Sequence, residues 1–143
     1  MRRNLLALAA CGVLALSTVP AAARSLDQAP PPAPYKKVSE LVKLPDFIPG
    51  IGTLFVDPKK LPDGPFLAYD HKGKLVSTIY MIPLKDLDGH KNIADLAAPS
   101  GKVDHVSILF NAGHPGVPEP HYHIVLWHVP VAQEQLVDQL EAG

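Results

Sequence analysis

Four of the seven histidines lie close together near the C-terminal end of the chain: His114, His121, His123 and His128. His121 and His123 are two residues apart in an apolar run that predicts a strand, so their side chains leave the same face. Their Cα atoms are then about 6.7 Å apart, a distance at which two imidazoles can converge on one ion. His114 precedes the strand in a Gly- and Pro-rich loop that can bring in a third imidazole. We predict a metal site formed by His114, His121 and His123.

Neutral imidazole is a ligand for Zn²⁺, Cu²⁺, Ni²⁺ and Fe²⁺, so the predicted cofactor is a divalent transition metal of this group. Four further residues are candidates for contacting the ligand side chains without binding the ion themselves: Asp104, His105, Glu119 and His128. Glu119 shares the histidine face if the strand extends back that far, and Asp104 begins the neighbouring strand, where a carboxylate can orient a ligand imidazole. His128 has the opposite parity to His121 and joins the cluster only through a bulge.

Three functions stay open for this cluster. The first is an exported domain that binds a transition metal, and the second is a small metal-dependent enzyme with an open coordination position at the same histidines. The third is a structural or stress-response oligomer whose histidines only hold the loop. The sequence has no G-x-S-x-G motif, P-loop or dinucleotide fingerprint, so it indicates no particular reaction.

The elements that position these residues are predicted to be mainly strands, because short apolar runs alternate with turn residues. The strands are expected at residues 51–56, 66–69, 75–82, 103–111 and 121–129, with a hairpin turn at 70–74. Short helices are expected at 39–44, 84–98 and 131–141. The fold class is therefore α+β and β-rich, an antiparallel meander or small barrel of about five strands with short helices at its edges.

Parity in the last two predicted strands suggests which residues face the core. Val106, Ile108 and Phe110 share one face of their strand with Asp104, and we expect this face to be buried. In the final strand, the face opposite the histidines carries Tyr122, Ile124 and Leu126, and we expect it to be core as well.

The N-terminus has the three parts of a secretory signal: basic Arg2 and Arg3, an apolar stretch, and the small residues Ala21–Ala23. The predicted organisation is a signal peptide at 1–23, a Pro-rich linker at 24–36 and a single β-rich domain at 37–143. The protein is then periplasmic or secreted, and has no membrane contact after cleavage. The alternative is a lipoprotein attached through Cys11.

The net charge and the cysteine content argue against a nucleic-acid partner and against sites built on cysteine. The chain of 143 residues has 13 basic and 14 acidic residues, and cleavage would remove Arg2 and Arg3, leaving 11 basic residues and a net charge of −3. A mildly acidic chain gives no reason to expect a nucleic-acid partner. Cys11 is the only cysteine, so a cleaved chain has no disulfide and no cysteine metal ligand.

Three short motifs resemble a small family of exported bacterial proteins catalogued as a domain of unknown function: Asp104-His105-Val106, Gly113-His114-Pro115 and Pro120-His121-Tyr122. The resemblance covers residues 50–129. That family includes a sigma-E-regulated Thermus protein that forms a ring, so the resemblance implies a compact β-rich domain and a possible homo-oligomer. Two positions depart from the family pattern: His123 stands where the family has Asp, and Val125 stands where it has a second strand His. The resemblance therefore carries over His114 and His121, whereas His123 rests on strand spacing.

Overall fold

The structure is a computed structural model and describes residues 25–99, 101–134 and 137. The signal peptide predicted for residues 1–23 and the alternative lipid-attachment residue Cys11 lie outside these residues, so export stays a prediction. In the described part of the chain, no helix is long and apolar enough to cross a membrane.

The described residues form six strands and four short helices. The strands are β1 (Lys36–Lys37), β2 (Thr53–Val56), β3 (Phe66–Tyr69), β4 (Leu75–Pro83), β5 (His105–Asn111) and β6 (His121–Trp127). The helices are the 3-10 helices η1 (Val38–Glu40) and η2 (Pro58–Lys60) and the α-helices α1 (Leu84–Asp88) and α2 (Val131–Glu134). The predicted α+β, β-rich class is confirmed.

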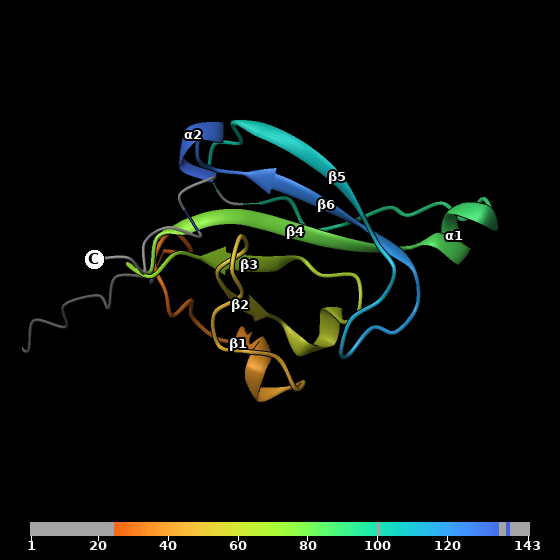
Figure 1. Cartoon of the computed structure of the whole chain (residues 1–143), viewed down its shortest axis with the longest axis horizontal. Coiled ribbons are helices and arrows are strands. Elements are labelled where there is room, and N and C mark those ends of the chain that lie inside the picture. Colours follow the sequence, from red (N-terminus) through yellow and green to blue (C-terminus); the bar gives the residue numbers. More distant parts are fainter. Residues whose placement is uncertain (1–24, 100, 135–136, 138–143) are drawn as a thin grey trace, which may run out of the picture.

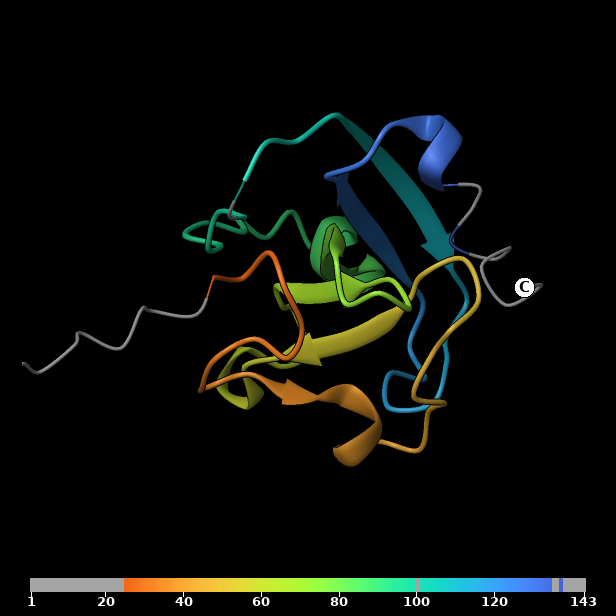
Figure 2. The same cartoon turned by 90° about the vertical axis from the view of Figure 1, so that its left-hand side faces the viewer.

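All six strands belong to one antiparallel sheet in the order β1-β2-β3-β4-β6-β5 (Figure 1). The predicted meander holds from β2 to β4, and β1, which was not predicted, extends it at one edge. Beyond β4 the prediction fails, because β6 inserts between β4 and β5, and β5 becomes an edge strand. The sheet does not close into a barrel. It curls, and β5 and β6 cross β3 at a steep angle (Figure 2). This order places the start of β6 beside the end of β4, because His121 pairs with Pro83.

The hairpin turn predicted at 70–74 joins β3 and β4, and the side chain of Asp70 fixes it. The Oδ1 atom of Asp70 accepts hydrogen bonds from the backbone N–H groups of Lys72 and Lys74, at 2.9 and 2.8 Å. Gly73 has a φ of +76°, which a residue with a Cβ atom rarely adopts. The turn therefore sets the register of the two strands at the centre of the sheet.

The central strands β3 and β4 are buried on both faces, so they lack the alternation of a one-sided sheet. On one face, Val56, Phe66, Met81 and Trp127 belong to the larger core cluster, which η1 and the loop after it cover. On the other face, a smaller cluster is formed by Phe55, Leu67, Tyr69 and Leu75.

The Pro-rich segment, predicted as a linker at 24–36, covers this smaller cluster with its described residues. The backbone N–H of Ala29 donates to the carbonyl of Gly73 (2.8 Å), and the N–H of Leu75 donates to the carbonyl of Asp27 (3.0 Å). Tyr69, which is fully buried, donates its hydroxyl proton to the carbonyl of Leu26 at 2.8 Å. Burial raises the pKa of this hydroxyl, so Tyr69 stays a neutral donor.

The prediction of the buried faces in β5 and β6 is wrong. Val106, Ile108 and Phe110 are 55%, 66% and 57% exposed, and their partners in β6 are only half-buried. The core face of β6 is instead the one with His121, which is buried together with Val125 and Trp127. Alternation shows which side chains share a face, but only the order of the strands decides which face the rest of the chain covers.

Two of the three predicted helices are shorter in the structure. Of residues 39–44, only the first two are helical, and they form the end of η1. The hydroxyl of Ser39 donates a hydrogen bond to the carboxylate of Asp46 and does not cap a helix. The helix predicted at 84–98 ends at Asp88, before Gly89. Of the helix predicted at 131–141, the first four residues form α2, and residues 135–136 and 138–141 lie outside the described part.

His105 joins α2 to the edge of the sheet. Its Nε2 atom lies 3.0 Å from a carboxylate oxygen of Glu134 in α2, and its Nδ1 atom lies 3.1 Å from Asp104. The ring stacks on Trp127 with a centroid distance of 5.9 Å. The hydrogen bond to Glu134, followed by the one to Asp104, raises the pKa of His105 above its ordinary value of 6.5.

The hydrogen bond of Tyr69 is the test of whether the Pro-rich segment is part of the folded unit. We expect Tyr69→Phe to lower the free energy of unfolding by about 1–2 kcal/mol, because it leaves the Leu26 carbonyl without its buried donor. Chemical denaturation followed by fluorescence measures the change. Tyr122→Phe is the matched control, since the ring of Tyr122 packs on Phe110 at the half-buried outer face. Equal stability of Tyr69→Phe and wild type would show that the segment is not tied to the sheet.

The raised pKa of His105 predicts a pH-dependent attachment of α2. A group with a raised pKa in the folded state stabilises that state below its unfolded pKa, near 6.5, and the gain is lost as the pH rises through the folded pKa. We therefore expect the stability advantage of wild type over His105→Phe, which keeps an aromatic ring on Trp127, to shrink from pH 6 to pH 9. Denaturation at a series of pH values measures it, and an advantage that grows with pH would contradict the ion pair.

Candidate metal centre

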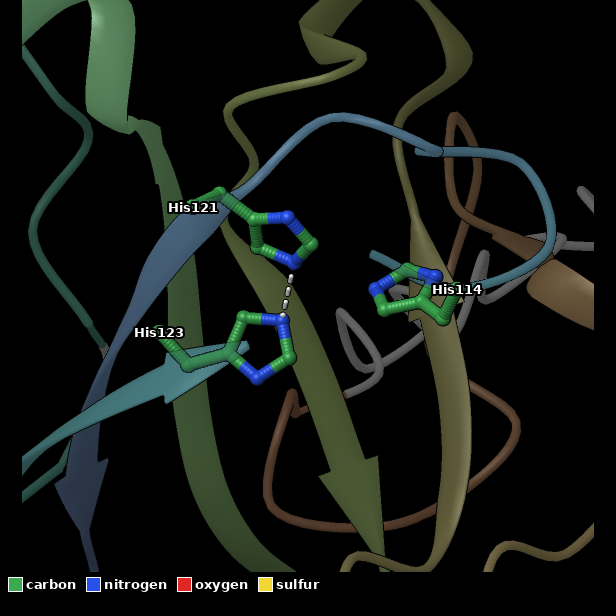
Figure 3. A group of neighbouring side chains, drawn as sticks. All are labelled: His114, His121 and His123. Carbon is green, nitrogen blue, oxygen red and sulfur yellow. Dashed lines mark hydrogen bonds between the residues drawn. The ribbon is translucent and has the colours of Figure 1, made fainter. Parts of the chain in front are cut away.

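Three histidines come together at the start of β6, next to the loop that joins β5 to β6. His121 and His123 are the first and third residues of β6, and His114 lies in the loop between β5 and β6. One nitrogen atom from each ring can be chosen such that all three lie within 4.8 Å of one another. Figure 3 shows one nitrogen of each ring on the side that faces the other two. The predicted convergence of these three side chains is therefore found in the structure.

The loop that holds His114 is fixed by its own backbone. His114 and Val117 exchange two backbone hydrogen bonds of 2.9 and 3.0 Å, which close a tight turn. Gly113, with a φ of +128°, lies so close to Pro118 that a Cβ atom would be 2.4 Å from the Pro118 carbonyl oxygen. The side chain of Asn111 accepts a hydrogen bond from the Gly113 N–H at 2.8 Å. A residue larger than glycine at 113 would shift the loop and with it His114.

Backbone carbonyls fix the tautomer of two of the imidazoles. The Nδ1 atom of His121 lies 2.7 Å from the carbonyl oxygen of Glu119, and that of His114 lies 3.0 Å from the carbonyl oxygen of Pro115. Because a carbonyl can only accept, Nδ1 must carry the proton in both rings. In the neutral ring, Nε2 is then left with its lone pair directed away from the backbone. This is the arrangement that orients histidines bound to metal ions.

His123 completes the cluster through His121. The two Nε2 atoms are 2.9 Å apart, and since that of His121 has a lone pair, that of His123 donates the proton. An ion bound by both rings would replace this proton. Two nitrogen ligands on a tetrahedral zinc ion are about 3.4 Å apart, so the pair needs only a small opening to bind one.

For His123, burial favours the neutral form that metal binding requires. His121 is fully buried, and His114 and His123 are half-buried. Burial, together with the neighbouring imidazoles of His121 and His114, lowers the pKa of His123 to about 4. At neutral pH, protons therefore compete little with a metal ion for this ring.

The donor set consists of three imidazoles and no carboxylate. In the part of the chain that the structure describes, this is the one group of three or more His, Cys, Asp or Glu side chains close enough to share an ion. Three histidines suit a borderline transition metal and leave a fourth tetrahedral position for water or another ligand.

The other candidate residues lie elsewhere or act differently. Asp104 and His105 are at the far end of β5, where His105 pairs with Trp127, six residues along β6 from His121. His128 lies between the hydroxyl of Thr78 (2.8 Å) and the carbonyl of Lys102 (2.9 Å). None of the three contacts the cluster.

Glu119 contributes to the cluster in a way that its residue type does not show. Its backbone carbonyl orients His121, while its carboxylate pairs with Lys85 at the surface, 2.6 Å from the Nζ atom. Asn111, which sequence reasoning missed, pairs with His121 across the strands and holds the loop through Gly113. The sequence Asn-Ala-Gly directly before His114 is the signal that marks such a side-chain-capped turn.

Comparison with known proteins agrees with the resemblance at the level of the family. The sequence pattern of the TTHB210-like family, described as Hypothetical protein TTHB210, matches residues 70–110. No curated protein matches the chain. The crystal structure of hypothetical protein TTHB210 from Thermus thermophilus is similar over 67% of this chain and 94% of the Thermus chain, with 48% sequence identity and a TM-score of 0.61. Because so similar a relative is matched along nearly its whole length, this chain belongs to the TTHB210-like family.

Proposed function

We propose that this protein is an exported domain that binds a divalent transition metal ion through His114, His121 and His123. The observation that carries the proposal is the orientation of the imidazoles. Two of them give their Nδ1 proton to a backbone carbonyl and direct an unprotonated Nε2 atom toward a common space. Export rests on the signal pattern of residues 1–23.

A structural role of the histidines explains less of this geometry. The hydrogen bond between His121 and His123 satisfies a buried ring without any metal. It gives no reason for His114 to be held within 4.8 Å of both by a loop that depends on a glycine at 113. A site for an ion accounts for all three rings at once.

The metal site is tested by calorimetric titration of Zn²⁺ and Cu²⁺ into protein recovered from the periplasm, whose intact mass also reports whether residues 1–23 are removed. We expect His114→Gln and His123→Gln to weaken binding at least about 100-fold, because losing a direct ligand costs more than losing a group that orients one. His128→Gln, on the same β-ribbon but outside the cluster, should bind as wild type does. Far-UV circular dichroism checks that each variant is folded.

Unchanged affinity in both ligand variants would overturn the metal site. The half-buried positions 114 and 123 are chosen because His121 is fully buried, and its replacement would disturb the core. Elemental analysis of the exported protein identifies the ion. Affinity alone cannot identify it, because the affinities of most sites follow the same general order of the transition metals.

Self-association is a second property that we propose, and the exposed outer face of β5 favours it. This strand forms an edge of the sheet, and Val106, Ile108 and Phe110 are each more than half exposed on the face that continues onto β6. An apolar edge strand of this kind is prone to pair with another chain. The resemblance to a ring-forming protein points to a second copy of this chain as the partner.

Substitution of the exposed face tests this association. We expect wild type to elute as an oligomer in size-exclusion chromatography with light scattering, and Ile108→Lys to shift it to the monomer, because a buried unpaired charge opposes assembly. Leu87→Lys is the control, because Leu87 is 44% exposed on α1, away from this face. A monomeric wild type would refute the proposed homo-oligomer.

A further inference from the structure

A cavity of about 290 Å³ lies between the covering loop and the sheet, next to the histidine cluster. Its walls come from η1 and the following residues to Ile51, from β2, β3 and β4, and from the loop at 114–117. Phe66, Ile79 and Met81 form part of the sheet side, and Val42 and Leu44 form part of the loop side. Gly116 closes this wall, because a Cβ atom there would lie 3.1 Å from Val42.

The size of the cavity limits its occupant to a small molecule. An apolar cavity of about 150 Å³ in a protein core takes up benzene, with its six carbon atoms. The present cavity has roughly twice that volume, which corresponds to about 10–12 non-hydrogen atoms. Leu41 and Leu61 line it and are 37% and 43% exposed, so the cavity reaches solvent at these two side chains.

The cavity is polar at one end only. Among the described residues that line it, Asn111, His114 and His123 are the only ones with polar side chains, and the others are apolar or glycine. Two of these three are ligands of the proposed metal site, so the polar end of the cavity is the open side of that site. The third, Asn111, has two amide N–H donors on the side chain whose oxygen is held by Gly113.

The charge balance at this end selects an anion. No Asp, Glu, Lys or Arg is among the described residues of the lining, and the three imidazoles are neutral as ligands. A divalent ion would therefore keep both positive charges in an apolar surrounding, where unpaired charge is unfavourable. The nearby carboxylate of Glu119 is paired with Lys85 at the surface. A carboxylate group of a ligand would supply the missing negative charge.

We infer that the cavity binds a medium-chain monocarboxylate, with its hydrocarbon body between the sheet and the covering loop and its carboxylate on the metal ion. The position of the carboxylate rests on the proposed metal function, whereas the fit of the hydrocarbon body rests on the cavity alone. The amide of Asn111 donates to the carboxylate oxygen that does not bind the ion. Binding is reversible, and no covalent bond of the ligand or the protein is formed or broken.

The inference is tested with octanoate, which has about ten non-hydrogen atoms. Zinc is first titrated into metal-free protein, and octanoate is then titrated into the zinc-loaded protein. Within a series from butanoate to octanoate, we expect the affinity to rise about fourfold per methylene, since each buried methylene contributes a constant amount. Hexadecanoate should gain little further, because its chain exceeds the cavity.

Variants separate the cavity from the metal. Leu41→Trp places a larger ring at the opening, where an exposed side chain can be enlarged without disturbing the core. We expect it to bind zinc as wild type does and octanoate at least about tenfold more weakly. Leu87→Trp, an exposed position on α1 outside the cavity, is the matched control and should leave both affinities unchanged.

Two measurements locate the carboxylate. In cobalt-loaded protein, octanoate should change the visible absorption spectrum of the ion, and 1-octanol should not. Metal-free protein should bind octanoate at least about tenfold more weakly than zinc-loaded protein, because the charge of the ion is absent.

The outcomes distinguish the two proposals. Zinc binding without octanoate binding, or octanoate binding that Leu41→Trp leaves unchanged, overturns the cavity ligand and leaves the metal site standing. Octanoate binding that is the same with and without metal overturns the position of its carboxylate. Protein that binds no zinc overturns the proposed metal site and the position of the carboxylate. Titration of octanoate into metal-free wild type and Leu41→Trp then decides separately whether the cavity takes the hydrocarbon body.

Discussion

His121 is fully buried at the start of β6, and a buried imidazole is unfavourable unless both of its nitrogen atoms have partners. The carbonyl of Glu119 takes the proton of Nδ1, which forces Nε2 to be an acceptor. That acceptor in turn orients His123 and keeps its donor 2.9 Å away. One backbone carbonyl thus determines the protonation of two rings, and the remaining ring, His114, is brought to them by a separately constrained loop. Nothing in the cluster depends on a charged side chain, which explains how it can lie against an apolar core.

The apolar core next to the cluster is incomplete because of how the sheet is covered. Both faces of β3 and β4 are buried, and short irregular segments provide most of the cover, since each helix has only three to five residues in the described part of the chain. Side chains from such segments do not interdigitate with a curled sheet as those of a long helix would. The loop after η1 therefore spans the concave region and encloses space. On the opposite face, the Pro-rich segment packs directly on Tyr69 and Leu75, and Tyr69 adds a hydrogen bond.

Local patterns in the sequence predicted the features that depend on neighbouring residues. The alternation in β6 placed His121 and His123 on one face, and the turn residues from Asp70 to Gly73 predicted the central hairpin. The features that failed depend on pairing across long distances. A meander puts β5 beside β4, whereas in the structure β6 takes that position, and this exchange decides which face of β6 is core. The ion pair of His105 with Glu134 could not be predicted from local sequence patterns either, because the two residues are 29 positions apart. The role of Glu119 rests on a carbonyl, which every residue has and no composition reveals.

The charge at the histidine cluster determines what the adjoining cavity can bind. Burial lowers the pKa of His123 to about 4, so at neutral pH this ring adds no charge to the polar end of the cavity. The other side chains of the lining are apolar apart from Asn111, so the apolar walls reach as far as the rings of His114 and His123. A bound divalent ion would bring positive charge to this end of the cavity. No carboxylate lies beside it among the described residues of the cavity lining. The ion would therefore be held most stably when an anion enters from the open side. Binding of the two is then thermodynamically coupled, and each should increase the affinity of the protein for the other by the same factor.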